Sequence, residues 1–422
     1  MYSSAAKIER LEARIAPAFF NNFAQTSLSY VDLDDDQVTI TVTKGNLIDT
    51  DFVFDTGFNF DGPQQLQMID LQDDLINSGT NITVTVKPSL FGDGLAHIGY
   101  INATNIDLGT VTVKGDLGRI DAGDGNTFTP GVKALNVQSI GRFGLLTQGG
   151  GGSTDSNIYG ALPSLTVKGG MNFATLNIFG GVNTQFNGKL GTAKFGGSLQ
   201  DAAIFTDGNI GKITIGGSVR VSLIQAGATA AGGNLGSLTI QGSLTDSIVG
   251  AGYQMGAVTI RGSMLNSTIE GFGILGVTPA IDTAIKSVTI GGDMENSFIL
   301  AGYDDYNVFY NADGSIGSVI IGGDFVKSNI VAGSAIGGDG SCGTFDDTLL
   351  AGNDTFRQAT ISKVIIKGQA VGTQGGSDAY GIVAETIVSA KVAGIGYPTF
   401  AFFSDFYDLT ASTTTDVILN EI

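Results

Sequence analysis

The sequence has very few of the residues on which most enzymes and metal proteins depend. It contains one Cys, one His and no Trp among 422 residues. The single Cys342 excludes an internal disulfide framework and a cysteine-based zinc site. The single His97 removes most metal-binding and nucleophile–histidine arrangements. Pro is also scarce, at 7 residues, which argues against a collagen-like chain or a proline-rich linker.

Basic residues and long apolar segments are scarce as well. Lys and Arg number 21 against 40 Asp and Glu, which gives a net charge of −19. Such a chain repels nucleic acid and anionic lipid, so neither is an expected partner. No apolar run approaches the roughly 20 residues that span a bilayer, so no transmembrane segment is expected. What the sequence has in abundance is Gly, at 64 residues, beside enough hydrophobic residues (42%) for an ordered core.

A short pattern of residues recurs along the chain. Clear copies begin at Ile210, Leu235, Met255 and Ile316, and each reads apolar-Gly-x-apolar-x-apolar-x-Gly. The residue that ends each copy is Gly115, Ser139, Gly169, Gly197, Gly217, Gly242, Gly262, Gly292, Gly323, Gly368 or Gly394. Successive spacings are 24, 30, 28, 20, 25, 20, 30, 31, 45 and 26 residues. Because 20 recurs as the minimum, one structural turn needs 20 residues and the remainder is inserted loop.

Apolar residues stand at fixed offsets from that reference position. They lie seven, four and two residues before it and two and seven residues after it, as in Ile210, Ile213, Ile215, Val219 and Ile224. The alternation predicts strands with one buried face, and several such strands per 20 residues require bends, which we attribute to the dihedral freedom of Gly. Equivalent residues then stack about 4.8 Å apart. The pattern predicts an all-β fold, a parallel β-helix (β-solenoid) of about 10 to 11 turns, right-handed by the crossover rule.

The segments outside the repeat predict covers for the ends of the coil, where strand edges would otherwise stay unpaired. Residues 25–104 have short strands without the repeat and predict a small β region that caps the solenoid formed by residues 105–396. Residues 397–422 are rich in aromatics and predict a C-terminal cap or a docking segment. Residues 1–24 predict an N-terminal segment that is either a cap or a docking or sorting element.

The inserted loops carry the candidate binding residues. They are predicted to leave the coil at one corner and to form one side of the rod. Aromatic rings that stack on sugars stand beside carboxylates in residues 343–347 and in a second loop with the candidates Tyr303, Asp304, Asp305, Tyr306, Phe309 and Tyr310. Glycoside hydrolysis needs two carboxylates at a set separation, which neighbours in sequence do not provide. No catalytic residue is therefore assigned, and no enzymatic activity is expected.

Two acidic segments are candidate binding sites for Ca²⁺, the one cofactor that the sequence suggests. Asp32, Asp34 and Asp36 alternate on a turn, and Ca²⁺ takes six to eight oxygen ligands. The turn departs from the EF-hand pattern, with no Gly at the sixth position and no Glu at the twelfth. Asp354 lies in residues 350–356, which resemble half of a calcium-binding nonapeptide repeat. A solvated acidic turn without a cation is the alternative.

Residues 10–18 read Arg-Leu-Glu-Ala-Arg-Ile-Ala-Pro-Ala. They resemble the Leu-Glu-Pro-Arg-type N-terminal motif of Gly-rich β-solenoid bacterial surface exoproteins, with Ala13 where that motif has Pro. The resemblance implies an extracellular or cell-surface location. We therefore expect a non-enzymatic structural protein, a rigid β-solenoid building block of a surface layer, fibre or matrix, able to self-assemble end to end. The alternatives are a β-helix that binds or depolymerises a polysaccharide through the aromatic-acidic loops, and an adhesin with a protein partner.

Overall fold

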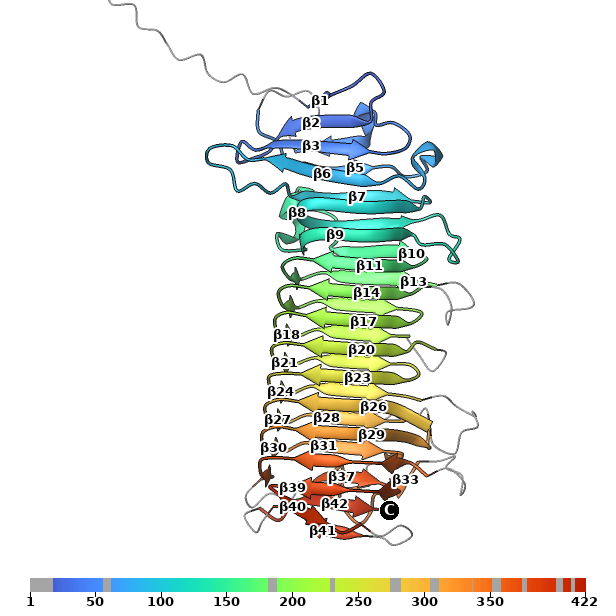
Figure 1. The fold of residues 1–422 in the computed structure, drawn as a ribbon, viewed down its shortest axis with the longest axis vertical. Helices are drawn as coiled ribbons and strands as arrows, with labels where there is room; N and C mark the ends of the chain where they lie inside the picture. Colours follow the sequence, from blue (N-terminus) through green and yellow to red (C-terminus); the bar gives the residue numbers. More distant parts are fainter. Residues whose placement is uncertain are drawn as a thin grey trace, which may run out of the picture.

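The chain winds into one long parallel β-helix, as predicted, with residues 19–31 and residues 406–421 at opposite ends of a rod (Figure 1). The computed structural model describes residues 18–55, 62–180, 188–227, 232–273, 282–303, 311–335, 337–350, 358–373, 378–399, 405–410 and 414–422. The N-terminal motif at residues 10–18 therefore lies outside the described residues, except for Ala18. Three sheets run along the rod, and the core lies between them.

The N-terminal end of the rod is built from antiparallel strands. These are β1 (Phe19–Phe20), β2 (Ser27–Val31), β3 (Gln37–Val42) and β6 (Ile82–Lys87), which pair in that order, and β4 (Phe52–Phe54), which pairs with β5 (Leu66–Asp70). Parallel pairing begins between β5 and β7 (Ile98–Thr104). β6 and β7 both stack in parallel on β8 (Leu108–Gly123), so parallel stacking begins within residues 66–104 and not at residue 105 as predicted.

The first sheet contains the recurring apolar pattern. After β8 its strands are β9 (Val132–Ile140), β11 (Leu162–Val167), β14 (Leu190–Phe195), β17 (Ile210–Ile215), β20 (Leu235–Ile240), β23 (Met255–Ile260), β26 (Asp282–Ile290), β29 (Gly314–Ile321), β35 (Val364–Ile366) and β39 (Ala390–Val392). The residues two before each reference position form one column from Val113 to Val392 through these eleven strands. The predicted register and number of turns are confirmed.

The second sheet contains the positions seven after the reference. Its strands after β7 and β8 are β10 (Asp155–Tyr159), β13 (Thr175–Phe179), β16 (Ala203–Thr206), β19 (Leu223–Ala226), β22 (Ile248–Ala251), β25 (Thr268–Gly271), β28 (Phe298–Ala301), β31 (Asn329–Ala332), β37 (Tyr380–Ala384) and β42 (Val417–Glu421). A third sheet of two-residue strands runs from β12 (Met171–Asn172) to β36 (Ala370–Val371).

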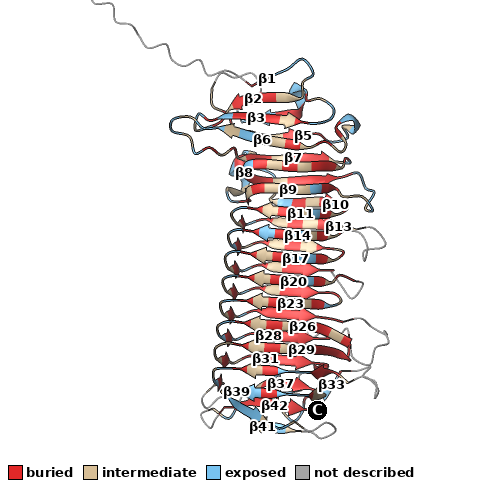
Figure 2. Cartoon of the chain, viewed as in Figure 1, coloured by how far each residue is buried: buried red, intermediate tan, exposed pale blue. Residues whose placement is uncertain are grey.

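Buried residues occur in the strands along the whole length of the coil (Figure 2), and their hydrophobic side chains form one continuous core. In one turn, Ile213, Ile215, Val219 and Ile224 are all fully buried. Burying an aliphatic side chain of this size contributes about 1.5 to 3 kcal/mol. Since each residue stacks on its equivalents in the turns above and below, that stabilisation comes from neighbouring turns rather than from one turn alone.

The prediction that Gly supplies the unusual dihedral angles at the corners holds at Gly394, whose φ is 84°, but is wrong at the other reference positions, from Gly115 to Gly368. Positive φ angles occur instead four residues later, at Phe173, Asp201, Val221, Asp246, Asn266, Asn296 and Lys327. The reference Gly is needed for space. A Cβ at Gly217 would contact the Oγ of Ser198 in the preceding turn and would lie 2.9 Å from its backbone N. Close stacking of turns therefore selects Gly here.

The left-handed corner predicts a stabilising substitution. Val221 has φ of 46°, a conformation that costs an ordinary L-residue about 1 to 2 kcal/mol and suits Asn better. We expect Val221→Asn to raise stability by about 1 kcal/mol, measured by thermal denaturation. The matched control is Asn266→Val, which should lower stability because it also removes the 3.1 Å hydrogen bond from Asn266 Nδ2 to Asp246 Oδ1. A lower melting temperature for Val221→Asn would contradict this account of the corner.

Side chains at two corners also tie successive turns together. The backbone N–H groups of Ser222, Ser247, Ser267 and Ser297 each donate to the Oγ of the equivalent Ser one turn further on. In a second column the Oδ1 of Asp293 accepts from the Asp324 N–H, and the Oδ1 of Asp324 accepts from the Gln369 N–H. In this second column, Asp carboxylates therefore accept the hydrogen bonds between successive turns, as Ser hydroxyls do in the first column.

The C-terminal segment closes the coil by adding one more rung. β42 stacks in parallel on β37, and Val417 and Leu419 continue the buried columns. Two antiparallel strands then cover the ends of the sheets: β41 (Phe406–Asp408) pairs with β42, and β40 (Ile395–Tyr397) pairs with β39. Among the described residues of this segment, aliphatic side chains therefore close the end of the core, and Tyr397 and Tyr407 pack against it.

One inserted loop leaves the coil at a different corner from the one predicted. Residues 155–159 form β10, which continues the second sheet between β8 and β13. The insertion in this turn is therefore residues 141–154, which include a 3-10 helix, η3 (Gly144–Gln148). This insertion lies before the second-sheet strand of its turn, whereas residues 124–131 lie after the second-sheet strand of theirs. The prediction that every insertion leaves from one corner is wrong for this loop.

Candidate functional site

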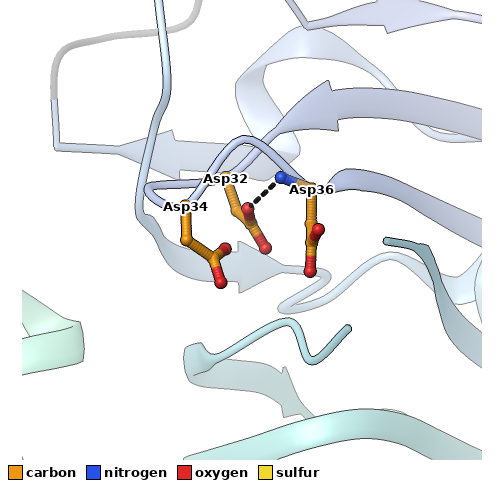
Figure 3. Close-up of side chains that lie close together, drawn as sticks. All are labelled: Asp32, Asp34 and Asp36. Atoms are coloured by element: carbon orange, nitrogen blue, oxygen red, sulfur yellow. Dashed lines mark hydrogen bonds between the residues drawn. The ribbon is translucent and has the colours of Figure 1, made fainter. Parts of the chain in front are cut away.

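In the described part of the chain, the acidic turn between β2 and β3 is the one group of three or more carboxylate, His or Cys side chains close enough together to hold a metal ion. Ligand oxygens of Asp32, Asp34 and Asp36 all lie within 4.8 Å of one another (Figure 3). Asp36 is fully buried and Asp32 is 8% exposed. A cavity of about 280 Å³ adjoins the turn, and its lining includes Asp32, Asp34 and His97. The sequence-predicted triad is therefore a spatial cluster.

Most carboxylate oxygens of this cluster already accept hydrogen bonds. Asp36 accepts from the N–H groups of Ser89 and Gly94, each at 2.6 Å. Asp34 Oδ2 accepts from the Asp93 N–H at 2.8 Å. Asp32 Oδ1 accepts from the Asp36 N–H at 2.8 Å. The turn therefore holds the loop of residues 89–94 against the N-terminal strands.

Burial and mutual proximity set the charge of the cluster. Burial, with the neighbouring Asp34 carboxylate, raises the pKa of Asp32 to about 8. The pKa of Asp34 is lowered: burial opposes the shift, but hydrogen bonds with Asp32 and the Asp93 N–H outweigh it. Burial also lowers the pKa of His97, so this ring is neutral at pH 7. These opposite shifts favour a cluster in which Asp32 keeps its proton beside an ionised Asp34.

The hydrogen bonds of this cluster limit the oxygens that it can offer to Ca²⁺. A calcium ion takes six to eight oxygens, and the oxygens of Asp36 both face backbone donors. Asp32 Oδ1 and Asp34 Oδ2 also accept from backbone N–H groups, so fewer of the six carboxylate oxygens remain for a cation. The role that the contacts support is structural, as an anchor for residues 89–94.

The proton on Asp32 predicts a dependence of stability on pH. Because the folded pKa of Asp32 lies above the unfolded value of 3.8, its contribution is fully present below pH 4 and is lost as the pH rises through about 8. Asp32→Asn keeps the Oδ1 acceptor and needs no proton, so it should be more stable than the native protein at pH 8.5 by about 2 kcal/mol. The difference should vanish near pH 4.

Urea denaturation of both proteins at the two pH values checks this prediction. Adding Ca²⁺ to the native protein at pH 8.5 is the companion measurement, and we expect no change in its midpoint. A calcium-dependent rise in the midpoint that Asp32→Asn abolishes would show that a cation, rather than a proton, occupies the cluster.

The predicted binding loop after β28 does not present Tyr303 to solvent. Tyr303 is 1% exposed and packs with Leu300, Val331 and Cys342 in a second hydrophobic cluster outside the coil. A ring buried in this way cannot stack on a sugar, so its assignment as a ligand-binding residue was wrong. The other candidates of that loop lie outside the described residues, as does the metal candidate Asp354; they are Asp304, Asp305, Tyr306, Phe309 and Tyr310.

In the second aromatic-acidic loop, residues 343–347, a carboxylate accepts hydrogen bonds from backbone N–H groups of the same loop region. Asp347 accepts hydrogen bonds from the N–H groups of Gly337, Gly343 and Thr344. Phe345 is largely exposed, and its ring stacks on Phe406 of β41 with the centroids 4.4 Å apart. The loop is thereby attached to the C-terminal cap.

The sequence prediction missed a mixed polar and aromatic strip on the outer face of the second sheet. The Arg119 guanidinium lies 4.5 Å from the centre of the Tyr100 ring, and both side chains contact the Asp121 carboxylate. Asn157 donates to Asp121, and the rings of Tyr159 and Phe179 stack at 5.0 Å. These residues precede the regular copies of the repeat, and only their alternation with buried residues such as Ile120 and Ile158 could have indicated one shared face.

Taken together, the fold and its anchored acidic turn define a parallel β-helix protein whose two ends are covered by antiparallel strands. No family model matches the chain, and no curated protein or solved structure is significantly similar to it. In the part of the chain that the structure describes, no helix is long and apolar enough to cross a membrane.

Proposed function

We propose that this chain is a non-enzymatic structural protein of an extracellular surface layer, fibre or matrix, in which the β-helix serves as a rigid building block. The observation that carries the proposal is the continuous register of the first sheet through eleven strands. Each rung bonds to the rungs on both sides, so bending the rod would break ladder hydrogen bonds and separate packed side chains.

Two further features support this role. Covers at both ends keep the core dry and leave the long sides of the rod free for contacts with neighbours. The net charge of −19 keeps such a rod soluble before it is incorporated into an assembly. The resemblance of residues 10–18 to the motif of surface exoproteins supports a location outside the cell.

Labelling of intact cells tests the location and the role together. Antibodies against the purified protein should label the surface of intact cells of the source organism, and protease treatment of those cells should remove the label. Lysed cells provide the control for total protein. Label that appears only after lysis would contradict the proposal.

Glycan binding is a second candidate function, favoured by the strip on the second sheet. Tyr159 is 44% exposed beside Phe179, and amide groups of Asn157 and Asn177 follow at the spacing of the rungs. A glycan array should be probed with the native protein, with Tyr159→Ala and with Phe128→Ala. Phe128→Ala is the control for the loss of an exposed ring elsewhere, since Phe128 lies on a loop of the shaft. Binding lost only in Tyr159→Ala supports the strip. Binding lost instead in Tyr306→Ala with Phe309→Ala would assign it to the loop.

A further inference from the structure

The outer face of the first sheet contains no acidic residue, although Asp and Glu outnumber Lys and Arg by 40 to 21 in the whole chain. This face consists of the outward positions five, three and one residues before each reference position, in the eleven turns from β8 to β39 (Figure 1). Every residue at these positions is at least partly exposed. Because none of them is Asp or Glu, the excess of acids lies elsewhere in the chain.

Exposed cations, in contrast, are concentrated on this face. Eight of the 21 Lys and Arg residues occupy its outward positions, and two more occupy the adjoining position, six residues before the reference. All ten are exposed, and none forms an ion pair with a carboxylate in the described part of the chain. They include Lys168, Lys194 and Lys212 in three successive turns and Lys363, Lys367 and Lys391 in the last two. These ten residues and the outward positions between them form the cationic face.

The strand register places hydroxyl groups directly beside these cations. Lys194 lies between Thr166 and Thr214 of the two adjacent strands. Lys212, one turn further on, pairs with Thr192. A Thr hydroxyl both donates and accepts hydrogen bonds, whereas a Lys ammonium only donates them. The cationic face therefore suits a partner that carries both anionic groups and hydroxyls.

The spacing of the charges favours a polyanion of low charge density. Ten cations over eleven turns give about one charge per 5 Å of the rod, at about 4.8 Å per turn. Double-stranded DNA has about one charge per 1.7 Å, and the net charge of −19 repels so dense a polyanion. The outward positions also contain no aromatic ring, on which the bases of single strands stack. A nucleic acid therefore fits this face poorly.

A second copy of the chain is also a poorer match for the cationic face. In the described shaft, the residues that follow the reference positions include Asp246 and Glu295, but Arg220 and Lys327 stand among them. Such a surface of mixed sign does not complement a face that is cationic throughout. A polymer of uronic acids does, because each of its sugars carries one carboxylate and several hydroxyls.

We propose that the cationic face binds a linear acidic polysaccharide, a chain of uronic acid units that lies along the rod. Its carboxylates pair with Lys168, Lys194 and Lys212 in successive turns, and its hydroxyls form hydrogen bonds with the Thr hydroxyls between them. The contact lies on the first sheet and is separate from the aromatic strip on the second. It goes beyond the proposed structural function by naming a partner, and it does not depend on where the protein is located.

Isothermal titration of the full chain with polygalacturonate tests the proposal. We expect binding in about 0.1 M NaCl, because a Debye length of about 10 Å screens the acids of other surfaces more than the direct contacts. Binding should be lost in about 1 M NaCl, where that length is about 3 Å. The triple variant Lys168→Gln, Lys194→Gln, Lys212→Gln should bind about tenfold more weakly, since three exposed ion pairs are removed. Its melting temperature should match the native value, because all three side chains are exposed.

The matched control removes three cations that lie after the reference positions, away from the cationic face. It is the triple variant Arg142→Gln, Arg220→Gln, Lys327→Gln, which loses the same net charge. Its affinity should stay within about twofold of the native value, because no contact with the polymer is removed. Neutral dextran and duplex DNA are the control ligands, and both should bind more weakly than polygalacturonate.

Several results would overturn the proposal. Native protein that fails to bind polygalacturonate, or an equal loss of affinity in the two triple variants, would contradict it. So would equal affinity for dextran, higher affinity for duplex DNA, or a loss of binding in Tyr159→Ala alone, which would place the site on the strip. Sedimentation velocity should show monomers in the same buffer; association that the variant of the cationic face abolishes would mean that a second copy covers this face. Surface labelling of cells is independent of these results, so the structural role is judged separately.

Discussion

Ile240→Asp is expected to unfold or severely destabilise the rod, with a loss of at least about 4 kcal/mol. Ile240 is fully buried in β20 and stacks between Ile215 and Ile260 of the neighbouring turns. A carboxylate there would have no cationic partner, and an unpaired buried charge costs about 3 to 5 kcal/mol. The substitution also breaks the column in the middle, where each half of the array depends on the other.

Thr239→Asp is the matched control, because it places the same residue one position away on the same strand. Thr239 is partly exposed and belongs to the outward column of Thr214, Thr239 and Thr259. It should cost less than about 1 kcal/mol, the range of strand propensities. Urea denaturation followed by circular dichroism compares the two. Equal losses would mean that the assignment of inward and outward faces is incorrect.

The second large effect is expected at a corner Gly. Gly242→Ala places a Cβ against the Ser218 Oγ, 2.9 Å from the Ser218 N and 3.0 Å from the carbonyl carbon of Gly217. Neither backbone atom can move away without separating two turns. We expect a loss of about 3 kcal/mol, the upper part of the range for overpacking.

Gly151→Ala supplies the comparison for that prediction. A Cβ at Gly151 has no atom within 4 Å, and the residue lies in the exposed loop before β10. The melting temperature of this variant should match the native value or exceed it slightly, since Ala reduces the entropy of the unfolded chain. If Gly242→Ala were equally harmless, close stacking would not be the reason for Gly at the corners.

The repeat made the coil predictable because its rungs are translations of one another. Once Ile213 and Ile215 are placed inward, the same offsets place Leu238 and Ile240 inward one turn later, and the structure follows this register to Ala390 and Val392. The corner conformation was not predictable in the same way. The left-handed position is occupied by Phe, Val and Lys as well as Asn, so its residue types do not reveal it.

The candidate site shows the limits of inference from neighbours in sequence. Asp32, Asp34 and Asp36 alternate within five residues of sequence, and they lie close together in space. Their donors at residues 89–94 come from a distant segment with no repeat to align it, so the anchoring role of the turn could not be foreseen. Tyr303 was misassigned for a similar reason, because Val331 and Cys342, which bury it, come from later segments.

Small-angle X-ray scattering of the monomeric protein tests the central claim, a single stiff rod, most directly. Eleven rungs spaced about 4.8 Å apart give a coil about 50 Å long, to which the capped ends add. The account predicts the scattering of a rod with one constant cross-section and one maximum dimension that does not change with salt. A broad distribution of dimensions, or the scattering of a sphere, would contradict it.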